Sequence, residues 1–238
     1  MSDNSEIWAV VPAAGLGSRM LQSVPKQYLR LHGKTVLEHT LDSLLACSDV
    51  TGVVVCISAD DQWFTELSVS QNRRIKVVDG GATRAESVLN GLRYLASKQN
   101  QAAWALVHDA ARPCVLTSVI DNMIDQLKND SLGGILAVPV KDTLKRANAD
   151  QTIAKTIDRA DVWHAQTPQM FRIEILMDSI IRALEKGLEI TDEASSLEWA
   201  GYTPRLIPGD ETNLKITTAN DLVLAEFLLK AKSSTITS

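Results

Sequence analysis

Two basic residues, Arg19 and Lys26, lie close together in the chain beside a run of small residues. The small residues are Ala13, Ala14, Gly15 and Gly17, in a segment that begins at Pro12 directly after the apolar residues 7–11. Small side chains let the backbone approach a ligand closely, and N–H groups in such a loop can hold phosphate oxygens. Two cations beside a phosphate loop suit phosphoryl or nucleotidyl transfer, because negative charge builds on the phosphate oxygens as the reaction proceeds.

This loop differs from two better-known phosphate-binding loops. A dinucleotide-binding fingerprint needs a third glycine where this chain has Met20, and a P-loop ends in Gly-Lys-Ser/Thr, which does not follow here. The glycines alone leave open a tight strand-to-helix turn with one exposed arginine. Lys26 alone leaves open an ordinary solvated lysine. The interpretation of the loop therefore depends on the rest of the chain.

Short apolar runs predict the sheet that must position these residues. They are rich in Val and Ile, do not alternate with polar residues, and cover residues 7–11, 53–57, 75–78, 104–108 and 135–140. Such runs are typical of strands buried on both faces of a parallel sheet. Amphipathic segments between them, such as residues 88–95, predict helices. The predicted fold class is therefore α/β, a three-layer sandwich with a mostly parallel, Rossmann-like sheet.

The pattern changes after Val140, and residues 141–166 are typical of a projecting arm. Most of them are polar, Asn148-Ala149-Asp150-Gln151 favours a turn, and apolar residues are isolated at Leu144, Ile153 and Ile157. We predict two polar strands that form a β-hairpin projecting from the sheet. Because an isolated hairpin is only marginally stable in water, we expect this arm to pack against a second subunit and form a homodimer.

Composition limits the class of protein. None of the 238 residues forms a linker-like stretch, so we predict a single domain, 1–238, with residues 141–166 as its dimerisation arm. The net charge of -5 argues against a nucleic-acid partner, which usually binds a basic face. No stretch approaches the ~18 apolar residues of a membrane span. The first residues lack the basic start and apolar run of a signal peptide, so we expect no membrane contact and a cytoplasmic location.

Six groups of residues, in a fixed order, together resemble one family. The first group is Pro12 to Met20 followed by Pro25-Lys26-Gln27-Tyr28. The other five are Asp79-Gly80-Gly81-Ala82-Thr83-Arg84 with Ser87-Val88, Val107-His108-Asp109-Ala110-Ala111-Arg112-Pro113, Asp158-Arg159, Thr167-Pro168-Gln169 and Thr191-Asp192-Glu193-Ala194. They are similar to the 2-C-methyl-D-erythritol 4-phosphate cytidylyltransferases of the non-mevalonate route to isoprenoids. The resemblance implies transfer of CMP from CTP to methylerythritol phosphate, with release of pyrophosphate.

The resemblance also implies roles for single residues. Arg19 and Lys26 match the pair that stabilises the transition state at the α-phosphate, and Arg159 with Lys215 would position the attacking phosphate. The residues implied to contact CTP are Pro12, Ala13, Ala14, Gly15, Gly17, Gly81, Ala82, Ser87, Asp109 and Ala110. Many members of the family carry Asp where this chain has Ala82, so if that Asp side chain helps to hold the base, this chain must rely on its backbone there.

The second substrate, the sugar-alcohol phosphate, is implied to contact Asp109, Arg112, Thr143, Arg159, Thr167 and Lys215. In the family, the residues matching Thr143, Arg159 and Thr167 come from the neighbouring subunit. The implied cofactor is Mg²⁺, held mainly by the triphosphate with Asp109 nearby. Without the resemblance, Asp109 is also typical of a turn cap, Arg112 of an arginine that braces the end of the sheet, and Arg159 of a surface charge.

Two other residues could be mistaken for catalytic groups. His108 precedes Asp109 and would suit a general base, but the attacking phosphate is already ionised at neutral pH, so no proton has to be removed. Glu193 could act as an acid, but an acidic residue in the first turn of a helix is explained more simply by the helix dipole. We assign neither residue a chemical step.

Two alternative functions stay open. One is a cytidylyltransferase of the same fold that acts on ribitol 5-phosphate, because its motifs overlap heavily with those above. The other is a nucleotide-binding module without catalysis, which has no need of Arg19, Lys26, Asp109 and Lys215 together. A pyrophosphate-release assay with both alcohol phosphates would separate these possibilities.

Overall fold

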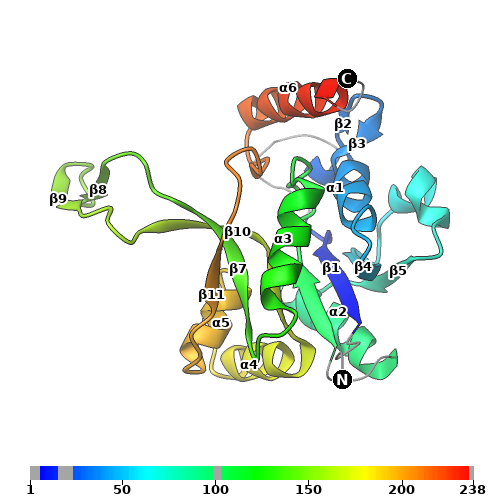
Figure 1. Ribbon diagram of the computed structural model, residues 1–238, viewed down its shortest axis with the longest axis horizontal. Helices are drawn as coiled ribbons and strands as arrows, with labels where there is room; N and C mark the ends of the chain where they lie inside the picture. Colours follow the sequence, from blue (N-terminus) through cyan, green and yellow to red (C-terminus); the bar gives the residue numbers. More distant parts are fainter. Residues whose placement is uncertain (1–5, 16–23, 99–102, 236–238) are drawn as a thin grey trace.

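The computed structural model describes residues 6–15, 24–98 and 103–235, and it has three layers. A seven-stranded sheet, in the strand order β11-β7-β10-β6-β1-β4-β5, lies between helices on both faces (Figure 1). Four of its strands pair in parallel: β1 (Ile7–Pro12), β4 (Val50–Ile57), β5 (Ile75–Asp79) and β6 (Trp104–Val107). These strands correspond to four of the five apolar runs in the sequence.

The other half of the sheet contains β7 (Gly133–Pro139), β10 (Trp163–Arg172) and β11 (Arg205–Pro208). β10 lies between β6 and β7 and runs antiparallel to both, whereas β11 is parallel to β7. The predicted three-layer fold with a mostly parallel sheet is therefore confirmed. The apolar runs do not predict β10 or β11, because polar residues and prolines interrupt both strands.

Both faces of the sheet are buried, which explains why the strands do not alternate in polarity. In β1, for example, Val11 packs in one core cluster and Val10 in the other. One cluster includes residues of α1 (Val36–Leu45) and α3 (Thr117–Leu127). The other includes residues of α2 (Arg84–Lys98), α4 (Ile173–Glu185) and α5 (Glu193–Trp199).

A third, smaller core cluster places α6 (Ala219–Thr235) beside the small hairpin of β2 (Arg30–Leu31) and β3 (Lys34–Thr35). Figure 1 shows α6 at the end of the molecule opposite α4. Ile216 is part of this cluster, and its N–H donates to the carbonyl of Ala111 at 2.9 Å, so the segment that leads into α6 is fixed beside the sheet. Among the described residues, no helix combines the length and apolar character that a membrane crossing requires.

The arm contains β8 (Leu144–Ala147) and β9 (Ile153–Ile157), which pair antiparallel. Figure 1 shows this hairpin projecting far from the three layers. The predicted β-hairpin is therefore confirmed. Residues 163–166 of the predicted arm lie in β10, so the projecting part is 141–162. Within this single chain Ile153 is 66% exposed, so its apolar side chain is left without burial.

Candidate active site

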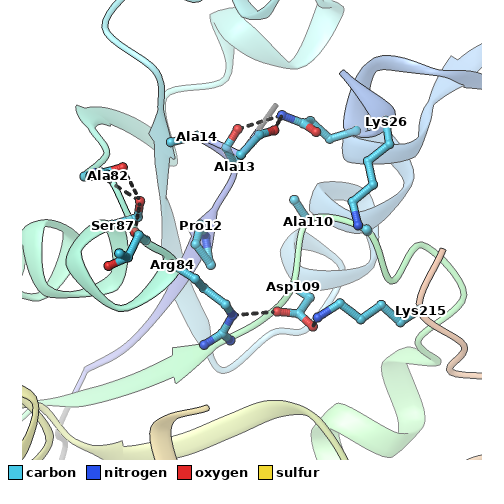
Figure 2. Close-up of a pocket in the computed structure, with 15 residues that line it drawn as sticks. Pro12, Ala13, Ala14, Lys26, Ala82, Arg84, Ser87, Asp109, Ala110 and Lys215 are labelled. Atoms are coloured by element: carbon cyan, nitrogen blue, oxygen red, sulfur yellow. Dashed lines mark hydrogen bonds and ion pairs between the residues drawn. The ribbon is translucent and has the colours of Figure 1, made fainter. Parts of the chain in front are cut away.

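A cavity of about 190 Å³ lies beyond the carboxyl ends of β1, β5 and β6. In open α/β sheets ligands bind at this edge, because the loops that leave neighbouring parallel strands meet there. The cavity is lined by Pro12, Ala13, Ala14, Gly15, Lys26, Gln27, Gly81, Ala82, Thr83, Arg84, Ser87, Asp109, Ala110, Ala111 and Lys215. Figure 2 shows small residues on one side of it and the charged groups on the other.

The predicted CTP-contacting residues line this cavity, with the exception of Gly17. Gly17 and the predicted catalytic residue Arg19 lie outside the described residues. Two other predicted catalytic residues, Lys26 and Lys215, line the cavity, whereas Arg159 does not. The structure thus brings most of the predicted site together in one place, and the chemical roles of these residues stay predictions.

The small-residue wall of the cavity is held in shape by Ser87 on α2. Its hydroxyl accepts a hydrogen bond from the N–H of Gly81 at 3.0 Å and donates one to the carbonyl of Thr83 at 3.0 Å. Thr83 and Glu86 form a reciprocal capping box at the start of α2, with bonds of 2.9 and 3.1 Å. Loop residues 81–83 therefore present their backbone groups to the cavity in a fixed arrangement.

Replacing Gly80 by alanine should raise the KM for the nucleotide roughly tenfold, because overpacking in a tight site costs ~1–3 kcal/mol. A Cβ on Gly80 would lie 2.4 Å from the Cβ of Ala14 and 3.0 Å from Oγ of Ser87, so two walls of the cavity must move apart. Steady-state kinetics would measure the change. Val77→Ala, on β5 (Ile75–Asp79) just before Gly80 but 45% exposed, is the control. An unchanged KM in folded Gly80→Ala would contradict the expectation.

Gln27 fixes the loop that follows β1. Its side-chain amide donates to the carbonyls of Ala13 at 2.8 Å and Gly15 at 3.0 Å, so these oxygens are directed toward Gln27. The sequence motif contains Gln27, but nothing in its residue type or spacing assigns it this role. Next to it, Nζ of Lys26 donates to the carbonyl of Ile216 at 3.1 Å, which places Lys26 against the segment that carries Lys215.

Asp109 is the centre of the charged side of the cavity. Its Oδ1 pairs with Nε of Arg84 at 3.0 Å, and its Oδ2 pairs with Nζ of Lys215 at 2.8 Å and with Nε of Arg112 at 3.4 Å. Burial alone would raise the pKa of Asp109, but the charges of Arg84, Lys215 and Arg112 lower it far below the usual value. Asp109 is therefore ionised at neutral pH.

The backbone of Asp109 is fixed by a buried hydrogen-bonded chain. The N–H of Asp109 donates to Oγ1 of Thr167 at 3.0 Å, and the same hydroxyl lies 3.0 Å from Nδ1 of His108. Nε2 of His108 lies 3.2 Å from the carbonyl of Arg112, so we assign the ring proton to Nε2 and let Nδ1 accept from Thr167. Burial lowers the pKa of His108 to about 4, which keeps the ring neutral.

Comparison with known proteins identifies the family of this chain. The sequence model for 2-C-methyl-D-erythritol 4-phosphate cytidylyltransferase matches residues 7–231. A protein of that name from Vibrio vulnificus (strain CMCP6) is 54% identical over 93% of this chain and 93% of its own length. Another from Haemophilus influenzae (strain PittEE) is 51% identical over 94% of this chain and 96% of its own. The chain belongs to the 2-C-methyl-D-erythritol 4-phosphate cytidylyltransferase family.

Solved structures of the same family share the fold. The cytidylyltransferase of Francisella tularensis superposes with a TM-score of 0.82 at 36% identity, over 94% of this chain and 100% of that one. The cytidylyltransferase of Thermus thermophilus gives a TM-score of 0.78 at 30% identity, over 94% and 99%. The resemblance that the six sequence motifs predict is confirmed, and the chain is an enzyme of the cytidylyltransferase class.

Four residues predicted to contact the second substrate of this cytidylyltransferase do not line the cavity of their own chain: Arg112, Thr143, Arg159 and Thr167. Arg112 pairs with Asp109 and donates to the carbonyl of Asn213 at 2.7 Å, which is the bracing contact that the sequence left open. Thr143 and Arg159 are exposed on the arm, where Arg159 donates to the carbonyl of Lys141. Within a single chain, neither arm residue belongs to the described cavity wall.

Thr167 lies on β10, inside the fold of its own chain. It is buried, lies outside the cavity lining, and its hydroxyl already serves Asp109 and His108 of the same chain. The predicted contact of Thr167 with a substrate phosphate stays a prediction. In this structure of the cytidylyltransferase, Thr167 sets the position of the Asp109 backbone.

Sequence reasoning did not assign a role to Arg84, which lines the cavity and contacts two acidic residues. Its Nη1 and Nη2 donate to the two carboxylate oxygens of Glu193 at 2.6 and 3.0 Å, and its Nε donates to Asp109. Glu193 opens α5, as the helix-dipole interpretation predicts, but it also forms this ion pair. In the sequence Arg84 directly follows residues 80–83 of the motif, but this position does not indicate which side chains it contacts.

The side chains of the cavity can supply only a small part of the ligands that a divalent cation needs. Asp109 is the one carboxylate in the cavity lining, and the described residues contain no cluster of three metal-binding side chains. Both oxygens of Asp109 already contact cations. Mg²⁺ commonly binds one or two carboxylates and takes its other ligands from phosphates and water. The chain therefore fits a cation that is held mainly by nucleotide phosphates.

Proposed function

We propose that this chain transfers CMP from CTP to 2-C-methyl-D-erythritol 4-phosphate and releases pyrophosphate, as a step of non-mevalonate isoprenoid biosynthesis. The proposal rests on the composition of the cavity. The cavity combines a fixed, small-residue wall with Lys26, Lys215 and Asp109 in a chain of this cytidylyltransferase family. A cytoplasmic location belongs to the same proposal, since the reaction consumes CTP.

In this reaction an oxygen of the substrate phosphate attacks the α-phosphorus of CTP in line. A new P–O bond forms as the bond between the α-phosphorus and the bridging oxygen of the β-phosphate breaks. Pyrophosphate leaves with the electron pair of that bond. The attacking phosphate is already ionised, so the neutral, fully engaged ring of His108 has no proton to accept. Catalysis consists of positioning and charge stabilisation, without a covalent intermediate on the protein.

Lys26 and Lys215 supply the charge for this step. Negative charge spreads over the equatorial oxygens of the α-phosphorus in the transition state, and fixed cations in a partly buried cavity stabilise it more strongly than water does. Lys215 is held by Asp109 at 2.8 Å, and Lys26 contacts the neighbouring Ile216 carbonyl at 3.1 Å. Both cations are therefore directed toward one end of the cavity before the substrates bind. A preformed arrangement of this kind avoids reorganisation during the reaction.

Mg²⁺ is part of this proposal as the cofactor of the nucleotide. When bound, it would neutralise charge on the triphosphate, with Asp109 as its nearest protein carboxylate. The residues of the chain do the rest: they hold the base, orient the phosphates and place two lysines beside them.

A second subunit completes the proposed site. Thr143 and Arg159 stand on the arm, which projects from the three layers (Figure 1), and neither lines the cavity of its own chain. Ile153 on the same arm is an exposed apolar residue, which a partner would bury. Exchange of arms across a two-fold axis would form an isologous homodimer and bring both residues to the partner's substrate phosphate.

The enzyme should turn over CTP much faster than UTP. The two bases differ at one exocyclic position, where cytosine donates a hydrogen bond and uracil accepts one. The backbone of loop 81–83 is fixed by Ser87, so it cannot adapt to the wrong pattern. A buried unpaired group costs ~1–3 kcal/mol, which corresponds to a preference of about tenfold or more. Pyrophosphate release with each nucleotide measures it, and equal rates would leave only a nucleotidyltransferase without a cytidine preference.

The same assay tests the acceptor and the alternatives. Methylerythritol phosphate should be the preferred acceptor, and faster turnover with ribitol 5-phosphate would favour the related enzyme instead. Binding of CTP without pyrophosphate release from either acceptor would favour a non-catalytic module. The ion pairs around Asp109 weigh against that module, because a binding protein needs no such concentration of charge beside the phosphate end of its cavity.

A further inference from the structure

Glu193 lies just behind the charged wall of the cavity. Its side chain is 1% exposed, and it does not belong to the cavity lining. Both of its oxygens accept hydrogen bonds from Arg84, at 2.6 and 3.0 Å. A parallel, two-bonded pair of this kind fixes the orientation of the guanidinium as well as its position. Glu193 therefore controls a residue that does line the cavity.

The position of Glu193 is itself set by a neighbouring strand. Gln169 on β10 accepts from the N–H of Ala194 at 2.9 Å and donates to Oδ2 of Asp192 at 2.8 Å. Asp192 caps α5 by accepting from the N–H of Ser195 at 3.0 Å. The first turn of α5 is thus tied to the sheet on both sides of Glu193. The carboxylate of Glu193 has little freedom to follow Arg84 if that side chain moves.

All three guanidinium nitrogens of Arg84 donate hydrogen bonds to two carboxylates. Nε pairs with Oδ1 of Asp109 at 3.0 Å, and the two terminal nitrogens pair with Glu193. A guanidinium without Glu193 would have both terminal nitrogens available to an anion in the cavity, and arginine binds phosphate in the same two-bonded manner as carboxylate. The carboxylate of Glu193 occupies the donors that a triphosphate would otherwise take.

We propose that Glu193 is a positioning residue for CMP transfer, which holds Arg84 on Asp109 and prevents the guanidinium from binding the triphosphate in an unproductive pose. The inference rests on the proposed function, because it assigns Glu193 an effect on that reaction. It predicts a specific kinetic result: loss of Glu193 slows the chemical step without weakening nucleotide binding.

Glu193→Gln keeps the size of the side chain and removes its charge. We expect kcat for CMP transfer to fall roughly tenfold to a hundredfold, as small displacements of a catalytic site do. The KM and the calorimetric Kd for CTP should stay equal or decrease, because Arg84 becomes available to the phosphates. A residue needed only for folding would lower the melting temperature without separating kcat from KM in this way. Glu198→Gln, an exposed residue on the same helix, is the matched control and should keep wild-type kinetics.

A double-mutant cycle with Arg84→Gln shows whether Glu193 acts through Arg84. In the Arg84→Gln background, Glu193→Gln should change kcat by less than about twofold, since contacting residues that act as a unit are not additive. This double variant also replaces a buried ion pair by two neutral amides, so it serves as the folded reference if a single variant is unstable. An equal loss of kcat in both backgrounds, or an unchanged kcat in folded Glu193→Gln, would overturn the proposal.

Two results distinguish the proposed function from the positioning role of Glu193. Absence of CMP transfer by the unaltered enzyme would remove the proposed function. Normal transfer by the unaltered enzyme, together with normal kcat in Glu193→Gln, would remove only the positioning role.

Discussion

Replacing Lys26 by alanine lowers kcat for CMP transfer by roughly a hundredfold or more, because a donor aimed at transition-state charge is worth ~3 kcal/mol. CTP affinity changes less, since Lys215, Asp109 and the small-residue wall stay in place. The cation contacts the Ile216 carbonyl at 3.1 Å before substrate binds, so its full effect appears only as charge develops on the α-phosphate. Single-turnover rates and calorimetric CTP binding would measure the two quantities independently.

The structure provides a matched control for this variant. Lys34→Ala removes an equally basic side chain that pairs with Asp42 on the surface, away from the cavity lining. Its kcat should be that of the unaltered enzyme. If Lys26→Ala stays within a few fold of wild type, Lys26 is not part of the catalytic machinery.

Mixing two nearly inactive variants restores activity if the arms are exchanged. One chain carries Arg159→Ala on the arm, and the other carries Lys26→Ala in the cavity. In a mixed dimer with exchanged arms, one site holds both defects and the other holds neither. Random pairing makes about half of the dimers mixed, and each has one intact site of two, so activity should recover to about a quarter of wild type.

A second mixture gives the control. Lys26 and Lys215 line the same cavity of one chain. Chains with Lys26→Ala and chains with Lys215→Ala therefore place one defect in each site of a mixed dimer, and no activity should return. Co-purification of differently tagged chains would verify subunit exchange in both mixtures. No recovery with the Arg159 variant, despite verified exchange, would assign Arg159 to the site of its own chain.

The parallel part of the fold could be predicted because burial on both faces leaves a direct signal in the sequence. Runs such as residues 53–57 are apolar at every position, since Val54 packs in one core cluster and Val55 in the other. β10 gives no such signal. Its buried residues include Gln166, Thr167 and Gln169, whose polarity is satisfied by hydrogen bonds to distant segments that a sequence window does not contain.

Some residues of the candidate site could likewise be placed from the sequence, and others could not. Residues that follow strands at one sheet edge, such as Ala14 and Asp109, could be placed together from topology alone. The partnership of Arg84 with Glu193 could not, because the two residues are 109 positions apart and their pairing depends on how β10 seats α5. Thr167 has a structural contact that its residue type does not indicate. Its residue type suits a phosphate contact, and its burial beside His108 also makes it a support for the backbone of Asp109.

The direction of one strand decides where an insertion emerges from this fold. β7 ends at Pro139 and β10 begins at Trp163, and the two are paired antiparallel at those residues. The polypeptide between them therefore leaves the sheet and returns to it at the same edge. The loops that follow β1 and β6 lie at this edge as well. Had β10 run the other way, the intervening segment would need to traverse the whole sheet before rejoining it. Segment 141–162 can consequently grow, shrink or diverge in sequence and still emerge on the ligand side.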